Sequence, residues 1–114
     1  MLKIDDENNV YLTRGDTAIF DVILTTDDGD PYTMTSNDEL IFTIRRIAGK
    51  GEEVVKKTVT APEISLDTDD TKDLTFGPYK YDVYIHNILT DEIDTFIANK
   101  EFYIGEEVHD FEQD

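Results

Sequence analysis

The sequence predicts an all-β protein, an antiparallel β-sandwich of about seven to nine short strands. The chain contains twelve Ile, seven Val and fourteen Thr against only seven Leu and four Ala, and β-branched side chains favour pleated strands over helices. Short segments with apolar residues at every second position recur along the chain, with turn residues between them. No segment is suited to the long helix of a βαβ crossover, which argues against a parallel sheet.

Short strands are expected throughout the N-terminal half, each bounded by polar or glycine-containing turns. A polar turn at residues 5–9 lies between two apolar segments and predicts a small hairpin. The break at residues 27–31 is strong, because Gly permits a positive φ and Pro cannot donate to a strand ladder. A glycine-containing loop at 48–51 predicts a second hairpin. In order, the expected strands are Leu2–Ile4, Val10–Thr13, 17–25, 39–47, 53–60 and Glu63–Leu66.

The C-terminal half continues this pattern after a single helical turn. Asp67 or Thr68 is expected to cap a turn within residues 67–74. Residues 79–86 alternate most cleanly, and a turn is expected at Ala98-Asn99 between two final strands, 92–97 and 100–104. The expected organisation is an N-terminal arm or short strand over 1–9, a sandwich domain over 10–105 and an acidic tail over 106–114.

One tyrosine narrows the fold class to an immunoglobulin-like sandwich. In such domains a tyrosine begins strand F two residues before a core position, and its hydroxyl bonds back across the corner from strand E. Tyr79 has the place of this corner tyrosine, and Tyr81 has the place of the core position. An ordinary strand tyrosine at position 79 is the alternative interpretation.

Charge and composition exclude several classes of function. There are 27 Asp and Glu against 10 Lys and Arg, which gives a formal net charge of −17 at pH 7. This negative field argues against direct binding to nucleic acid or to an anionic membrane. The chain has no Cys and only two His, which argues against thiolate or histidine-rich metal sites. No apolar run is long enough to span a membrane, and the N-terminal residues do not resemble a signal peptide.

No motif predicts catalysis, a cofactor or a metal centre, so we expect a non-enzymatic protein. The phosphate-binding, dinucleotide-binding, zinc-protease and nucleophile-elbow motifs are all absent from the sequence. His86 and His109 are interpreted as surface residues, and Arg14-Gly15-Asp16 as a glycine turn rather than an integrin-binding loop. Acidic clusters without EF-hand spacing favour turn formation and solubility over calcium binding; they lie at 5–7, 27–30, 67–73 and 106–107.

The only basic pairs are Arg45-Arg46 and Lys56-Lys57. If residues 40–47 and 53–60 form a hairpin, the two pairs lie on neighbouring strands and could mark a docking edge. The alternative is that these cations hinder aggregation at an edge strand.

Turn and strand motifs also follow one another in a familiar order. They are 12–17 (LTRGDT) with the alternating residues after it, 28–32 (DGDPY), 38–46 (DELIFTIRR), 74–83 (LTFGPYKYDV), and 95–97 (TFI) leading to 102–108 (FYIGEEV). This order resembles the small immunoglobulin-like domains encoded among tail and baseplate genes of phages and prophages of Gram-positive bacteria, including the N-terminal domain of baseplate upper proteins. The resemblance implies a β-sandwich used as a virion building or docking module, with no active-site residues.

The leading functional hypothesis is therefore a non-enzymatic tail or baseplate module, located in the virion or in the cytoplasm of the bacterial host. Its partners would be other virion proteins, and a homo-oligomer is the alternative assembly that the sequence leaves open. A second hypothesis is a saccharide-binding module whose exposed aromatic residues would be Tyr11, Tyr32, Tyr84 and Tyr103. A third is an acidic nucleic-acid mimic that occupies a basic partner protein, because carboxylates can stand in for phosphates.

Overall fold

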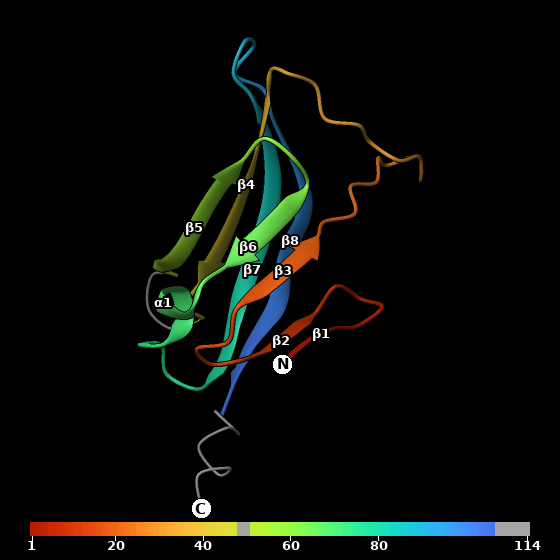
Figure 1. Ribbon diagram of the computed structural model, residues 1–114. Coiled ribbons are helices and arrows are strands. Elements are labelled where there is room, and N and C mark those ends of the chain that lie inside the picture. The colour runs from red at the N-terminus through yellow and green to blue at the C-terminus, as the bar shows by residue number, and fades with distance from the viewer. Residues whose placement is uncertain (48–50, 107–114) are drawn as a thin grey trace, which may run out of the picture.

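The protein is an all-β sandwich, as the sequence predicts (Figure 1). The computed structural model describes residues 1–47 and 51–106. The described part of the chain folds into two sheets and one helical turn, which loops connect. Its elements are β1 (Leu2–Ile4), β2 (Val10–Thr13), β3 (Ala18–Asp21), β4 (Asp38–Arg45), β5 (Glu53–Val59), β6 (Glu63–Leu66), α1 (Thr68–Thr71), β7 (Gly77–Asn87) and β8 (Ile93–Gly105).

The larger sheet has the strand order β1-β2-β8-β7-β4-β5, and β3 pairs with β6 in the smaller one. The order β8-β7-β4 facing a β3–β6 pair corresponds to the G-F-C and B-E strands of an immunoglobulin-like sandwich. One pairing departs from the antiparallel expectation, because β2 runs parallel to β8 with Val10 opposite Phe102. This parallel pair needs no crossover helix, since the whole domain lies between the two strands in sequence.

The core lies between the inner faces of the two sheets, and Phe42 is at its centre. The Phe42 ring is fully buried, and its centroid lies 5.6 Å from that of Tyr81, 6.0 Å from Phe20 and 6.2 Å from Phe102. Aliphatic residues at alternate strand positions pack around these rings; they include Val10, Leu12, Leu40, Ile44, Ile64, Leu66, Val83, Ile85 and Ile104. The residues that pack together are therefore those whose alternation predicted the strands.

The local structure before β7 agrees closely with the expectation from sequence. Asp67 is the N-cap of α1, and the Asp70 carboxylate accepts a 2.7 Å hydrogen bond from the Asp67 amide. Gly15 lies in a turn with a φ of 82°, which favours glycine. The Gly15 amide donates to the hydroxyl of the buried Thr71 at 2.8 Å. Residues 14–16 thus join the β2–β3 turn to α1.

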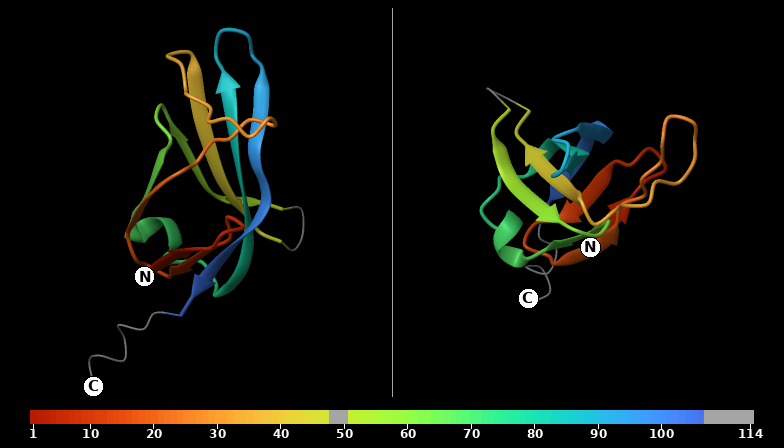
Figure 2. Two further views of the ribbon diagram at one scale, coloured as in Figure 1. Left: turned by 90° about the vertical axis from the view of Figure 1, so that its right-hand side faces the viewer. Right: turned by 90° about the horizontal axis from the view of Figure 1, so that it is seen from above.

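The turn predicted at Ala98-Asn99 is wrong, because β8 continues through it as one long strand (Figure 2). Tyr81 pairs with Lys100 and Val83 with Ile97, so β8 accommodates an extra residue at this point. Asn99 has a φ of 55°, a left-handed conformation that Asn tolerates better than most residues. This bulge lets Ile97 and Phe102 both face the core although they are five positions apart, an offset that places two residues on opposite faces of a regular strand.

Strand 17–25 is also shorter than predicted. The ladder with β6 ends at Asp21, although the Val22 amide still donates to the Pro62 carbonyl at 2.8 Å. Val22 and Leu24 remain buried, so the predicted alternation persists beyond the hydrogen-bonded strand.

Candidate functional site

The two tyrosines singled out in the sequence lie in the core. The Tyr79 hydroxyl lies 3.0 Å from the carbonyl oxygen of Thr75, to which it donates, and 3.0 Å from the Thr75 hydroxyl. This is the backward bond that a corner tyrosine requires. Tyr81 is buried two residues later, and its hydroxyl donates to the Asn8 carbonyl. Burial, and secondarily the charge of Asp5, raise the pKa of Tyr81 to about 12. The geometry assigns both residues a structural role.

The four basic residues proposed as a docking edge do not form one surface. Arg45 points to the outer face of the large sheet, where its Nε lies 2.7 Å from the Asp82 carboxylate. Lys57 is opposite Phe42 on the inner face, and its Nζ lies 2.9 Å from an oxygen of Asp70. Lys56 has the outward register opposite Thr43. Arg46 instead lines an open hollow of about 260 Å³; the other lining residues are Ile47, Thr75, Phe76, Pro78 and Tyr79.

The acidic clusters that the structure describes are used mainly in turns. The Asp5 carboxylate accepts hydrogen bonds of 2.9 Å from the amides of both Asn9 and Glu7. These bonds, that of Asn9 first, lower the pKa of Asp5. Among residues 1–47 and 51–106 no group of three or more His, Asp or Glu is arranged to hold a metal ion. His109 and the expected tail 106–114, apart from Glu106, lie outside the described residues.

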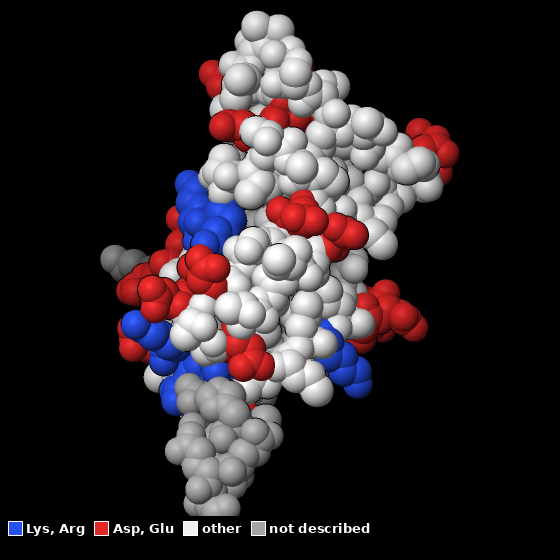
Figure 3. Space-filling view, viewed as in Figure 1, with Lys and Arg blue, Asp and Glu red and all other residues white. Residues whose placement is uncertain are grey.

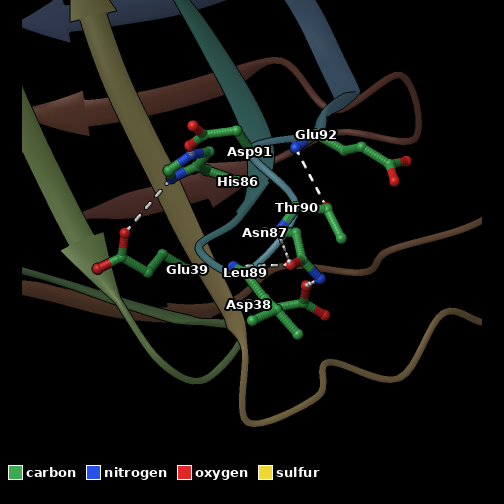
Figure 4. A network of polar contacts seen from close by, with 8 residues as sticks. All are labelled: Asp38, Glu39, His86, Asn87, Leu89, Thr90, Asp91 and Glu92. Atoms are coloured by element: carbon green, nitrogen blue, oxygen red, sulfur yellow. Dashed lines mark hydrogen bonds and ion pairs between the residues drawn. The ribbon is translucent and has the colours of Figure 1, made fainter.

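A different part of the molecule has the features of an interaction site. We call it the hairpin end: the β7–β8 turn and its flanks (84–97) together with the segment that leads into β4 (22–39). The hairpin projects at the top of Figure 1, away from α1 and from the N-terminus. Figure 4 shows the polar network that orders it.

Asp38 anchors this network from the first position of β4. Only 3% of the residue is exposed. Its carboxylate accepts hydrogen bonds from the Tyr32 hydroxyl at 2.6 Å, the Thr35 amide at 2.9 Å and the Asn87 side-chain amide at 3.4 Å. The Thr35 amide and then the Tyr32 hydroxyl lower the pKa of Asp38, although burial opposes them. The same bond to Asp38 raises the pKa of Tyr32 to about 12, so a charged carboxylate and a neutral phenol persist at pH 7.

The turn at the tip is held by its own backbone and side chains. The Asn87 side-chain oxygen accepts bonds of 3.0 Å from the amides of Leu89 and Thr90. The Ile88 amide donates to the Asn37 carbonyl at 2.8 Å, which joins the tip to the segment before β4. Asp91 has a φ of 63°, and its backbone amide closes the turn by donating a 2.8 Å hydrogen bond to the Asn87 carbonyl. The tip therefore has a defined conformation.

His86 connects the tip to β4 on the outer face. Its Nε2 lies 2.8 Å from an Asp91 carboxylate oxygen, and its Nδ1 lies 3.6 Å from the Glu39 carboxylate. The Asp91 hydrogen bond is the main cause that raises the pKa of His86, and Glu39 adds to it. The sequence interpretation of His86 as a plain surface residue missed this pair of carboxylates, which long-range register brings together.

Apolar side chains cover the tip itself. Leu89 is 76% exposed, Ile93 65% and Ile88 55%. In the space-filling view of Figure 3 the top of the molecule is mostly white, with acidic atoms below it. The sequence did contain a signal, because two aliphatic residues occur side by side in a segment that otherwise reads as a polar turn.

The charge at this end has a single sign. Residues 22–39 and 84–97 contain eight acidic residues and no Lys or Arg. On the face shown in Figure 3 the basic atoms lie in the middle and lower parts of the molecule. A hollow of about 260 Å³ opens between the two segments, lined by Tyr32, Asp38, Ile85, Asn87, Thr90, Glu92 and Asp94.

Comparison with protein-family models, with curated proteins and with solved structures found no match for this chain. A search of the described residues for a helix of sufficient length and apolarity to cross a membrane also found none.

Proposed function

We propose that this protein is a non-enzymatic structural or docking module of a phage or prophage particle, and that it acts in the tail or baseplate through protein–protein contacts. The observation that carries the proposal is the apolar tip of the β7–β8 hairpin. Three large aliphatic side chains lie mostly in solvent at the end of the longest hairpin. Clustered exposed apolar side chains of this kind are typical of protein interaction sites.

The internal order of the tip supports a docking role. Asn87 and the Ile88–Asn37 bond hold the turn in one conformation. A preorganised loop loses less conformational entropy on binding than a disordered one. The resemblance of residues 10–108 to tail and baseplate domains supplies the cellular context of the proposal.

Purified particles provide the direct test. Particles released by the source phage or prophage are probed with an antibody against this chain, and we expect the chain in the particle fraction. A Leu89→Ser variant should be lost from particles, whereas Ile19→Ser should be retained. Ile19 is a matched control because it is 67% exposed and lies on β3 of the other sheet. Absence of the unmodified chain from intact particles would refute the proposal.

A pair of exposed tyrosines favours saccharide binding as a second candidate function. Tyr11 and Tyr103 pair on the neighbouring strands β2 and β8, with ring centroids 6.2 Å apart and rings tilted by 41°. Both lie partly in solvent, and adjacent aromatic faces can stack on sugar rings. Intrinsic tyrosine fluorescence during titration with cell-wall saccharides tests this candidate. No spectral change, together with no signal on a glycan array, would dismiss it.

A further inference from the structure

We propose that the hairpin end docks onto a positively charged protein surface that contains an apolar recess, with Ile88 and Leu89 inserted in the recess. This inference rests on the proposed docking function and specifies the chemistry of the partner. It combines two properties of the same surface: an ordered apolar projection and a surround that carries acidic residues without Lys or Arg.

The apolar projection supplies the contact energy. Ile88 and Leu89 are adjacent, mostly exposed, and held outward by a turn whose backbone is bonded to Asn87 and Asn37. The transfer of each aliphatic side chain from water into a partner's recess lowers the free energy of the complex. Side chains that become fully buried near the centre of an interface contribute most of the affinity, and a polar rim surrounds them.

The acidic residues around the tip indicate that the partner surface is positively charged. Asp91 and Glu92 flank the tip, and Asp94 lies on the adjoining part of β8. Asp38 is ionised at pH 7, since its pKa lies below the ordinary value. Lys and Arg are absent from the two segments of this surface, so a cationic partner meets attraction over the whole of it.

The same charge argues against a second copy of this chain as the occupant. Each copy has a formal net charge of −17, so two copies repel one another as they approach. The recess that a second copy could offer to the tip is the open apolar hollow at Arg46. The neighbouring segment 67–73 contains four Asp and one Lys, so its net charge has the same sign as that of the hairpin end. Charge complementarity therefore favours a basic partner of a different sequence.

Two synthetic peptides test the inference on the full chain. The first is an amphipathic helix of Lys and Leu with all leucines on one face. The second has the same composition in scrambled order, which leaves the charge but removes the apolar face. Binding is followed by amide chemical shifts in ¹⁵N NMR spectra and by calorimetry. We expect the amphipathic peptide to shift residues 86–94 first and to bind at least about tenfold more tightly than the scrambled one.

Variants separate the apolar contribution from general attraction between charges. Leu89→Ser combined with Ile88→Ser should weaken binding of the amphipathic peptide by at least about tenfold, with little effect on the scrambled peptide. Ile19→Ser, the control on β3, should change neither affinity. Added salt should weaken both interactions, because ions screen attraction between exposed charges.

The absence of peptide binding at the tip would overturn the inference, and so would any of three further results. One is equal affinity for the two peptides, and a second is shifts spread equally over the acidic turns at 5–7 and 67–73. The third is a dimer in sedimentation velocity that the Leu89→Ser variant abolishes, which would identify a second copy as the occupant. Loss of the Leu89→Ser variant from particles without peptide binding at the tip would refute only the basic partner. Peptide binding at the tip by a chain absent from particles would refute only the virion function.

Discussion

Replacing Asp38 with alanine tests the network that orders the hairpin end. The change removes the acceptor of the Tyr32 hydroxyl, the Thr35 amide and the Asn87 side chain. A hydrogen bond to a charged group contributes ~1.5–3 kcal/mol, and a buried donor left unpaired costs ~1–3 kcal/mol. The Asn87 bond is long at 3.4 Å, and the adjoining hollow lets water reach the freed donors. We therefore expect the free energy of unfolding to fall by about 2–4 kcal/mol.

Urea unfolding measures this loss, with the slope m unchanged if the unfolded state is unaffected. Asp94→Ala is the matched control, because Asp94 lines the same hollow but is exposed. The control should change the free energy of unfolding by less than about 0.5 kcal/mol. In hydrogen exchange, Asp38→Ala should also reduce protection of the Ile88 amide, which bonds to Asn37. Equal stabilities of the two variants would refute the assigned role of Asp38.

The effect of Asp38 should depend on pH. Hydrogen bonds, from the Thr35 amide first, hold the pKa of folded Asp38 below its unfolded value. The carboxylate therefore contributes its stability above the unfolded pKa, and this contribution is lost as pH falls through the folded pKa. The difference in unfolding free energy between the natural chain and Asp38→Ala should accordingly narrow in acid. A difference that stays constant from neutral pH down to about pH 2 would contradict the lowered pKa.

Three further predictions concern other parts of the molecule. Tyr79→Phe removes the bond to Thr75 and should lower the free energy of unfolding by about 0.5–1.5 kcal/mol, whereas an unchanged melting temperature would argue against a corner role. In NMR, His86 should titrate above the ordinary histidine pKa, and Asp91→Asn should lower that pKa, because the hydrogen bond to Asp91 is the main cause of the increase. Any stability that the charged imidazole contributes is present at low pH and is lost as pH rises through the folded pKa. Added salt should raise the melting temperature at pH 7, since it screens the repulsion within a chain of net charge −17; a salt-independent melting temperature would indicate that the repulsion is already neutralised.

Local pattern was sufficient to predict most of the strands. The alternation around Tyr79, Tyr81 and Val83 predicted both β7 and its buried face. The cap at Asp67 followed from the preference of Asp for that position. Ala98 and Asn99 misled the prediction, because a bulge and a turn both favour Asn with a positive φ. Only the neighbouring strand distinguishes them, since β7 pairs with β8 on both sides of the bulge although the register shifts there.

The hairpin end could not be derived in this way. Asp38 and Asn87 are far apart in sequence, and the register of β4 against β7 brings them together. The same register places Glu39 opposite His86. The basic pairs show the same limit, because successive strand residues point to opposite faces, so Lys56 and Lys57 lie on different faces of β5. A prediction of the site thus required the pairing of strands in addition to their positions.

We propose the apolar tip of the β7–β8 hairpin as the docking surface of this protein. Its most direct test compares particles made with the Leu89→Ser chain and with the Ile19→Ser chain, after both variants are shown to unfold at the same urea concentration as the natural chain. We expect the Leu89→Ser chain to be missing from purified particles and the Ile19→Ser chain to be present in natural amounts. Natural amounts of both variants would show that the tip is not the docking surface.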